Sequence, residues 1–373
     1  MKIIAILLVL TACNPGDFRQ APDYDLEVEK KSIAFGDTIV SPVFSLFSIE
    51  NLANTDSPQH LFLDRFKNIV ITNPVQARFI RKIAIKRGDG PNSISSGIND
   101  FFPLSDSTFL IESFPSYYII NNSGETIKKI DILSKLSNLF GDKYEDDLYI
   151  TSSMSHVPII NQNEYVLQVF RPNLHIQADY PEYPLFVKMR IDENLRVELI
   201  PLDIFFPEEF KTQPNSTYAQ LERPKYNTTD NHIVFGFGFS SKVFMYNLAN
   251  NTMSSLDLTI ENGTNFSPPE PTATTQIGNI LFTGFDVPLI DFENKKIFRH
   301  HIDVNEEDPM SSTNYLSVFD TDGKKLIESS LGKNSDRMLR NPFLLDGQFY
   351  MNSYFPATEE ENLDFYIFSL IEK

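Results

Sequence analysis

The stretch Asn121-Asn122-Ser123-Gly124-Glu125-Thr126-Ile127 lies between two segments of strand-like composition, residues 117–120 and residues 128–132. Asn and Gly adopt the backbone angles of a tight turn at low cost, and the flanking segments are rich in Tyr and Ile. A turn of this composition between two such segments predicts a β-hairpin.

The same hairpin pattern recurs along the chain. Phe319-Asp320-Thr321-Asp322-Gly323-Lys324 joins residues 315–318 to residues 325–329. Similar turns occur at residues 192–194, 248–251 and 292–295. Helical periodicity is nearly absent, and residues 131–140 form the one fair helix candidate. The chain therefore predicts an all-β fold.

The strands group into clusters, which begin near residues 60, 101, 157, 217, 287 and 342. A spacing of roughly 40–60 residues, with about four strands in each cluster, is typical of a β-propeller. Six clusters predict six blades. The boundaries of the fifth blade stay open, because residues 260–286 have room for a further strand pair or an insertion. Two consecutive β-sandwiches are the alternative, but no linker-like composition divides the chain.

The two ends of the repeating region complement each other. The last cluster finishes in an apparent strand, residues 363–370, and is one strand short, while the first plausible strand, residues 26–35, stands outside the first cluster. Pairing these strands would close the ring and hide two exposed sheet edges. We therefore predict a six-bladed β-propeller domain over residues 25–373, closed by an N-terminal strand.

The segment before this domain predicts localisation at a membrane. Leu10-Thr11-Ala12-Cys13 follows Lys2 and the apolar run 3–10, which is too short to span a bilayer as a helix. It resembles the lipobox of bacterial lipoproteins, with residues 1–12 as the signal peptide and Cys13 as the lipidation site. Residues 13–24 would be the lipidated tether. An ordinary signal peptide followed by a chance cysteine is the alternative.

The residue after the cysteine bears on localisation. Asn14, rather than Asp, favours the outer membrane under the enterobacterial sorting rule. We therefore expect a lipid-anchored protein of the cell envelope at the outer membrane. Periplasmic and outward-facing display both stay open.

The composition restricts the classes of partner. The formal net charge is −18, from 32 Lys and Arg against 50 Asp and Glu, and cleavage would also remove Lys2. Nucleic acids and anionic lipid headgroups repel such a chain, so neither is expected as a partner. The 32 Phe residues predict a core filled by aromatic rings between sheets. Cys13 is the only cysteine, so no internal disulfide can form.

Three stretches carry a family resemblance: residues 86–92 (Lys-Arg-Gly-Asp-Gly-Pro-Asn), residues 106–111 (Asp-Ser-Thr-Phe-Leu-Ile) and residues 288–299, which end in Ile-Phe-Arg. With the lipobox, they resemble lipoproteins that carry the domain of unknown function 4221, relatives of six-bladed propeller lipoproteins. The resemblance implies a propeller, an envelope location and no established reaction. Ile297-Phe298 stands where that family more often has two tyrosines, so no role of a phenolic hydroxyl carries over.

Two places are candidates for ligand binding. Arg299, His301 and Asp303 would share one face of a strand, with His300 on the other face. A cation, an imidazole and a carboxylate together suit an anionic ligand or acid–base chemistry, although structural pairing is the commoner reason for such a set. Arg87 lies in a Gly-rich loop that suggests a phosphate cradle. That loop lacks the Lys-Ser/Thr of a P-loop, which favours a tight passage between blades instead.

No cofactor, metal site or catalytic set is predicted. His300 and His301 are adjacent and point to opposite faces, so they do not readily chelate one ion. The other histidines lie far apart in sequence, at positions 60, 156, 175 and 232. The chain shows no nucleophile elbow, zincin helix or Ca²⁺ loop pattern.

The function that best fits these features is a binding or scaffold module for a protein, peptide or glycan partner. The alternative is a propeller-type hydrolase or lyase that acts on glycans or peptides at the channel mouth. Carboxylates, His and Arg converging at one mouth would favour the enzyme. An apolar channel with a large aromatic rim would favour partner binding.

Overall fold

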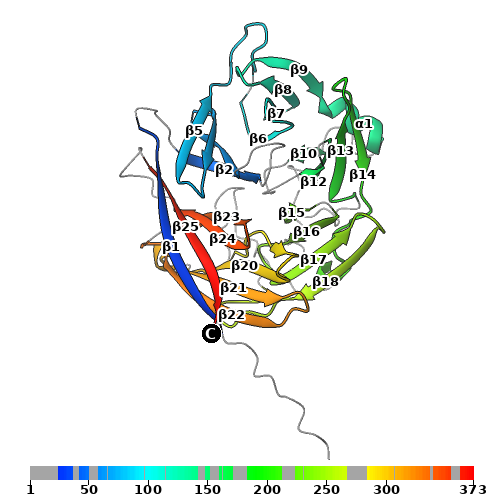
Figure 1. Ribbon diagram of the computed structural model, residues 1–373. Helices are drawn as coiled ribbons and strands as arrows, with labels where there is room; N and C mark the ends of the chain where they lie inside the picture. Colours follow the sequence, from blue (N-terminus) through cyan, green and yellow to red (C-terminus); the bar gives the residue numbers. More distant parts are fainter. Residues whose placement is uncertain are drawn as a thin grey trace, which may run out of the picture.

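The computed structural model describes residues 24–36, 42–49, 58–64, 66–95, 97–113, 115–141, 148–151, 159–161, 163–170, 183–211, 223–229, 231–266, 284–305, 307–336, 339–353 and 362–373. In these residues the strands form six antiparallel sheets arranged around a ring, as Figure 1 shows. The predicted six-bladed β-propeller is confirmed, and the alternative of two β-sandwiches is wrong. The signal peptide and almost all of the predicted tether, with Cys13, lie outside the described residues.

The first three blades follow the chain in order. The first contains β2 (Pro42–Ile49), β3 (Gln59–Asp64), β4 (Ile69–Asn73) and β5 (Arg78–Ile83). The second contains β6 (Asp100–Pro103), β7 (Thr108–Ser113), β8 (Ser116–Asn121) and β9 (Thr126–Asp131). The third contains β10 (Tyr149–Thr151), β12 (Glu164–Phe170), β13 (Phe186–Ile191) and β14 (Val197–Pro201), with β11 (Ile159–Asn161) paired to β12.

The last three blades continue the pattern. The fourth contains β15 (Lys225–Thr228), β16 (His232–Gly236), β17 (Lys242–Asn247) and β18 (Thr252–Asp257). The fifth contains β19 (Leu289–Asp291), β20 (Lys296–Asp303), β21 (Thr313–Asp320) and β22 (Lys325–Lys333). The sixth contains β23 (Leu339–Leu345), β24 (Gln348–Ser353), β25 (Asn362–Glu372) and β1 (Tyr24–Ala34).

The predicted start of the first blade, near residue 60, is wrong, because β2 already begins at Pro42. Nine residues, 50–58, separate β2 from β3 in the sequence. Because hairpin turns usually have about two to five residues, the two strands did not stand out as a hairpin, and the first strand was missed. The second, fifth and sixth blades begin at Asp100, Leu289 and Leu339, close to the expected positions.

The sixth sheet combines the first and last described strands of the chain. β1 runs antiparallel to β25, with Tyr24 opposite Glu372 and Ala34 opposite Asn362. β1 also contacts β22 of the fifth blade and β5 of the first blade. It therefore occupies the outermost position of the sixth blade, next to both neighbours. Whether this pairing holds the ring shut stays a prediction.

Helices are few in the described residues. α1 (Ile132–Phe140) begins where the sequence predicts a helix, and its N-cap Asp131 accepts a hydrogen bond from the backbone N–H of Ser134 at 3.1 Å. The others are short: α2 (Glu208–Lys211) and the 3₁₀ turn Pro309–Ser311. None of the described helices is long and apolar enough to cross a membrane.

The core lies between neighbouring blades. As expected, Phe rings fill much of it. Phe210, on α2, packs edge-on against the rings of Phe237 and Phe244, at centroid distances of 5.5 and 5.7 Å. A second apolar cluster joins the fourth and fifth blades through Val234, Ile297 and Phe319. This packing holds adjacent sheets at fixed positions and so fixes the geometry of groups between them.

Candidate functional site

The connections between strands divide between two ends of the ring. In a four-stranded antiparallel blade, the turns after the first and third strands lie at one end of the sheet, and the turn after the second strand and the passage to the next blade lie at the other. We name the end with the turns between third and fourth strands the short-turn end. These turns are residues 74–77, 122–125, 192–196, 248–251 and 321–324.

The opposite end carries most of the long segments, and we name it the long-connection end. Its passages between blades include residues 84–99, 132–148, 202–224 and 258–288. Long connections on a rigid scaffold are where binding and catalytic groups concentrate. In the sixth blade, Tyr24 and Glu372 occupy the place of a turn between third and fourth strands. The two ends of the propeller domain therefore lie at the short-turn end.

Two buried carboxylates meet at the long-connection end of the second blade. Asp100 opens β6, the strand of this blade nearest the centre in Figure 1, and lies directly opposite Glu112 of β7. Asp100 is 1% exposed and Glu112 is 7% exposed. Like charges directly opposite each other on a sheet are destabilising, so this pair needs compensating donors.

The donors for Glu112 come from two blades. Thr151 of β10 lies with its hydroxyl 2.9 and 2.8 Å from the two carboxylate oxygens. The hydroxyl of Tyr117, on β8, lies 3.3 Å from Oε2 of Glu112 and donates to the carbonyl of Ile150 at 3.0 Å. Burial, together with the charges of Glu112 and Asp100, raises the pKa of Tyr117 well above its usual value, so this phenol stays a donor.

A cation completes the group. Arg223 lies two residues before the start of β15, with its guanidinium carbon 4.7 Å from the ring centroid of Phe170. Burial lowers the pKa of Arg223, and the charge on Glu112 opposes that shift. The guanidinium of Arg223 and the carboxylate of Glu112, on the second blade, therefore attract each other. We call Asp100, Glu112, Tyr117, Thr151 and Arg223 the carboxylate cluster.

Further polar groups continue along the same end to the fifth blade. Lys225 donates to the carbonyl of Phe285 at 2.9 Å, and its ammonium lies 4.0 Å from the carboxylate of Asp286. Nδ1 of His300 lies 3.4 Å from the other oxygen of Asp286, and its Nε2 lies 3.2 Å from Oδ1 of Asn314. Polar side chains, including charged groups of both signs, therefore extend from the second to the fifth blade at the long-connection end.

Arg299, a predicted ligand-binding residue, is buried between the fourth and fifth blades. It is 0% exposed, and a guanidinium N–H donates to each of the carbonyls of Asp286, Phe237 and Ser240. Its guanidinium carbon lies 4.9 Å from the ring centroid of Phe285. These contacts pair its donors with three backbone carbonyls, of which that of Phe237 also accepts the backbone N–H of Ser240 at 3.2 Å.

His301 is buried next to Arg299, whereas Asp303 is exposed. Nε2 of His301 donates to the carbonyl of Asn262 at 2.8 Å, and its ring stacks on Tyr315. Burial lowers the pKa of His301 to about 4, a shift that the hydrogen bond to Asn262 opposes. A Cβ built on Gly263 would lie 3.8 Å from the His301 ring and 3.9 Å from Cβ of Asp303. Both side chains therefore share the face toward the fourth blade.

Arg87 lies far from this group, in the connection between the first and second blades. It is exposed, and the loop around it is fixed by backbone hydrogen bonds, from Gly88 to Ile94 at 3.0 Å and from Ile94 to Lys86 at 2.9 Å. Lys86 also pairs with Glu125 at 2.6 Å, which ties the loop to the second blade. The structure therefore brings Arg299, His301 and Asp303 together and leaves Arg87 apart.

The carboxylate cluster was missed by sequence reasoning. Glu112 directly follows the apolar run of residues 108–111, and a carboxylate at the end of such a run was the available signal. Its partners lie on other blades, so only the fold reveals them. Within the described ranges, no group of three or more His, Cys, Asp or Glu side chains is arranged to hold a metal ion.

Comparison with known proteins identifies a family. The family model described as "Domain of unknown function (DUF4221)" matches residues 28–330. The crystal structure of a DUF4221 family member from Bacteroides vulgatus ATCC 8482 is similar, with a TM-score of 0.69 and 14% sequence identity, over 95% of this chain and 100% of that chain. At this identity the similarity shows the fold alone.

Weaker structural similarities extend to other proteins. A luciferin-regenerating enzyme has a TM-score of 0.46 at 8% identity, over 91% of this chain and 95% of that chain. BamB from Moraxella catarrhalis has a TM-score of 0.36 at 9% identity, over 84% of this chain and 74% of that chain. No curated protein matches the chain. Neither weak similarity supports a functional conclusion.

Proposed function

The chain belongs to the DUF4221 family, and we propose that it acts as a lipid-anchored binding or scaffold module of the cell envelope, at the outer membrane. Its long-connection end would bind a protein, peptide or glycan partner. Cys13 would carry the lipid, and residues 13–24 would be the tether to the propeller.

The position of the chain ends carries this proposal. Tyr24 and Glu372 lie opposite each other at the short-turn end, so a tether over residues 13–24 would enter the propeller there. The segment 14–23 reaches at most about 35 Å when fully extended. A lipid on Cys13 would therefore keep the short-turn end toward the membrane and present the long-connection end away from it.

Charge and loop length suit that end to recognition. It combines the long passages between blades with the carboxylate cluster and with Lys225, Asp286 and His300. Mixed charges favour specific recognition over nonspecific adsorption, because a wrong partner leaves a charge unpaired. The overall charge of −18 argues against nucleic acid as the partner.

Site-specific photo-crosslinking in intact cell envelopes tests the proposal. A photoreactive residue replaces Phe205 or Met310, which are 43% and 45% exposed on connections at the long-connection end. Matched controls carry it at Ser123 or Asn194, in exposed short turns. We expect discrete crosslinked products from the first pair of positions and none from the controls. Equal crosslinking at all four positions, or none at any, would contradict the proposal.

The carboxylate cluster supports a second candidate, a hydrolase or lyase acting on glycans or peptides. Asp100 and Glu112 are directly opposite, with Arg223 acting on Glu112, and paired carboxylates are the usual groups of general acid–base catalysis. Release of new reducing ends or new amino groups from envelope glycans or peptides would reveal such activity. Under this hypothesis Glu112→Gln abolishes the release, and a variant that keeps full activity excludes the cluster as the catalytic site.

A further inference from the structure

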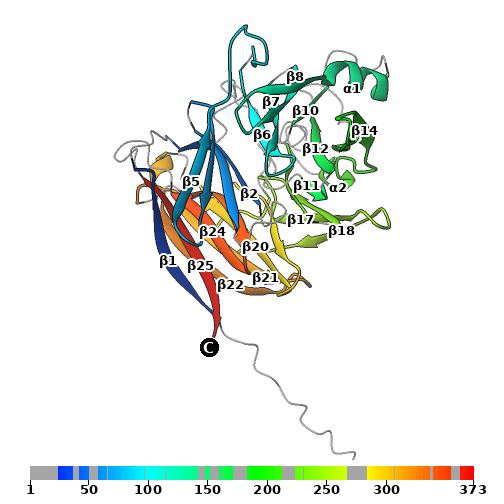
Figure 2. The ribbon, with the colours of Figure 1, turned by 45° about the horizontal axis from the view of Figure 1, so that its top comes forward.

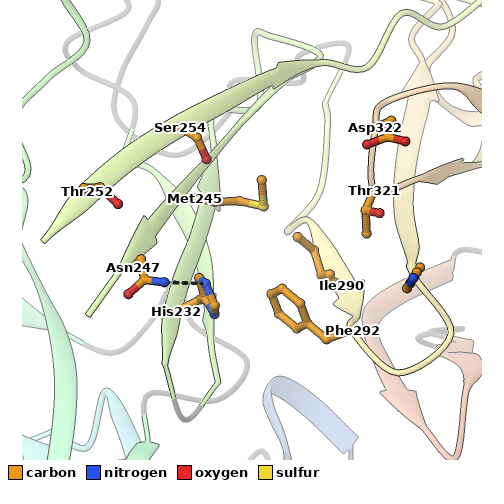
Figure 3. Close-up of a pocket in the computed structure, with 10 residues that line it drawn as sticks. His232, Met245, Asn247, Thr252, Ser254, Ile290, Phe292, Thr321 and Asp322 are labelled. Carbon is orange, nitrogen blue, oxygen red and sulfur yellow. Dashed lines mark hydrogen bonds between the residues drawn. The ribbon is translucent and has the colours of Figure 1, made fainter. Parts of the chain in front are cut away.

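A cavity of about 590 Å³ opens between the fourth and fifth blades, at the opposite end from the carboxylate cluster. Figure 3 shows its two walls. His232, Met245, Asn247, Thr252 and Ser254 form the wall from the fourth blade, and Ile290, Phe292, Lys295, Thr321 and Asp322 form the wall from the fifth. Its volume lies within the range of small-molecule sites.

The hydrogen bonds of Asn247 fix the state of His232. Oδ1 of Asn247 accepts the backbone N–H groups of Ala249 and Asn250, at 2.9 and 3.3 Å, so its Nδ2 is the donor toward His232. Nε2 of His232 lies 3.1 Å from that donor and is therefore the acceptor. Burial lowers the pKa of His232, which favours the neutral ring with its proton on Nδ1. That N–H has no partner among the described residues and is available for a ligand.

The aromatic ring of Phe292 lies beside His232. Phe292 stacks on His232 with ring centroids 4.9 Å apart and an angle of 24° between the planes. Although it is fixed in this way, Phe292 stays 41% exposed. An exposed large aromatic side chain with a rigid orientation offers an apolar platform at low entropic cost.

The remaining lining groups are two apolar side chains, Met245 and Ile290, and a set of polar groups that is neutral when taken together. Ser254 and Thr321 contribute hydroxyls that donate and accept hydrogen bonds, and the hydroxyl of Thr252, which already donates to Oδ1 of Asn250 at 2.6 Å, contributes an acceptor. Lys295 and Asp322 contribute one positive and one negative charge, both exposed and without an ion pair in the described part of the chain. A balanced site on a protein of charge −18 favours a ligand without net charge.

From this combination we propose that the cavity between the fourth and fifth blades binds a neutral mono- or disaccharide. A sugar ring has an apolar C–H face to lie on Phe292, and hydroxyls around its edge to meet His232 Nδ1–H and the three hydroxyl side chains. An amino acid or dipeptide satisfies Lys295 and Asp322, but it leaves the hydroxyl-lined wall and the aromatic platform without matching groups. This site is separate from the proposed partner-binding end.

Titration calorimetry on the full chain, purified in a detergent without sugar headgroups, tests the proposal. The probes are glucose, galactose and N-acetylglucosamine as neutral sugars, glucuronate and glucosamine as charged ones, and Ala-Ala as a dipeptide. We expect at least one neutral sugar to bind with a Kd below about 10 mM. Phe292→Ala and Ser254→Trp should each weaken that binding by at least about ten-fold, the first by removing the platform and the second by filling the cavity.

Phe66→Ala is the matched control, because Phe66 is also 41% exposed but lies on the first blade, outside the cavity. It should bind the sugar like the wild-type protein. Unfolding midpoints equal to wild type would show that all three variants are folded, and both mutated cavity residues are exposed. No binding of any neutral sugar, tighter binding of a charged sugar or of Ala-Ala, or wild-type binding by both cavity variants would overturn the proposal.

Discussion

The guanidinium of Arg299 and the imidazole of His301 lie side by side on β20, in the contact between the fourth and fifth blades. Both side chains are buried, so their polar groups depend on protein atoms for hydrogen bonds. Arg299, on the fifth blade, donates to carbonyls of the fourth blade and thereby links the two, whereas His301 stays neutral and donates through Nε2. Substitutions of the two residues should therefore affect the stability of the protein in different ways.

Replacing Arg299 should destabilise the fold. Arg299→Leu leaves the carbonyls of Phe237 and Ser240 without these donors, and we expect the free energy of unfolding to fall by at least about 2 kcal/mol. Arg87→Leu removes an exposed arginine with no side-chain hydrogen bond among the described residues, and should change stability by less than about 0.5 kcal/mol. Urea unfolding measures both. Equal stabilities for the two variants would contradict the structural role of Arg299.

Acid should lower the free energy of unfolding through protonation of His301. Burial lowers the pKa of this ring to about 4 in the folded state, whereas the ordinary value in an unfolded chain is about 6.5. Between these values the unfolded chain binds a proton that the folded chain does not. The free energy of unfolding should therefore fall as pH drops from about 6.5 to about 4, by up to about 3 kcal/mol, and be unaffected by His301 above about pH 7.

His301→Gln isolates this contribution from that of the many carboxylates. Its amide keeps a donor for the carbonyl of Asn262 but does not titrate. Urea unfolding at about pH 7.5 and about pH 5 should give a smaller loss of stability for His301→Gln than for the wild-type protein. Parallel losses in both proteins would show that His301 does not take part.

The sequence predicted some of these residues and not others, for a physical reason. Alternation along one strand is local, so the common face of Arg299 and His301 followed from spacing alone. The partners that determine their chemistry come from the fourth blade and, in the case of Asn262, from the passage that follows it. Sequence spacing along one strand does not predict such distant contacts. The sequence analysis missed Glu112 for the same reason, because its partners Thr151 and Arg223 come from other parts of the ring.

At the scale of elements, β-hairpins could be predicted from the sequence. A turn such as residues 122–125 is specified by its own side chains, and the oxygen of Asn121 accepts the backbone N–H groups of Ser123 and Glu125 at 2.9 and 3.0 Å. Strand β2 is separated from β3 by residues 50–58, which is longer than such a turn, and it was missed. Pairing between distant strands is different, because no turn joins β1 to β25. The sequence indicated this pair only because the last cluster was one strand short and the first plausible strand stood outside every cluster.

Strand β1 offers a test of ring closure within one element. Ile33 is 0% exposed and packs in the cluster with Phe62, Phe343 and Phe365, between the sixth and first blades. Ile33→Ala should lower the free energy of unfolding by about 2–4 kcal/mol and speed amide exchange in β25, because the cavity loosens the outer strand. Val28→Ala, in the same strand at 47% exposure, should do neither. Unchanged exchange in β25 for Ile33→Ala would contradict a closing role of β1.

At the scale of the whole molecule, the direction of each end follows from topology. In every blade the third strand ends at the short-turn end. In the sixth blade this strand is β25, whose Glu372 lies opposite Tyr24. An N-terminal anchor therefore orients all six blades at once. The long-connection end then faces away from the membrane without any further contact, provided that Cys13 carries a lipid.

That condition can be tested directly with Cys13→Ser. Without the thiol there is no atom to acylate, so we expect a protein that is unlipidated, uncleaved at residue 12 and absent from its normal membrane fraction. Thr11→Ser keeps Leu10, Ala12 and Cys13 and should mature and fractionate like the wild-type protein. Metabolic labelling with a fatty acid, the mass of the mature N-terminus and membrane fractionation measure the three effects. Unchanged maturation and fractionation of Cys13→Ser would show that the chain is not anchored through this residue, and the orientation inferred from the anchor would fall with it.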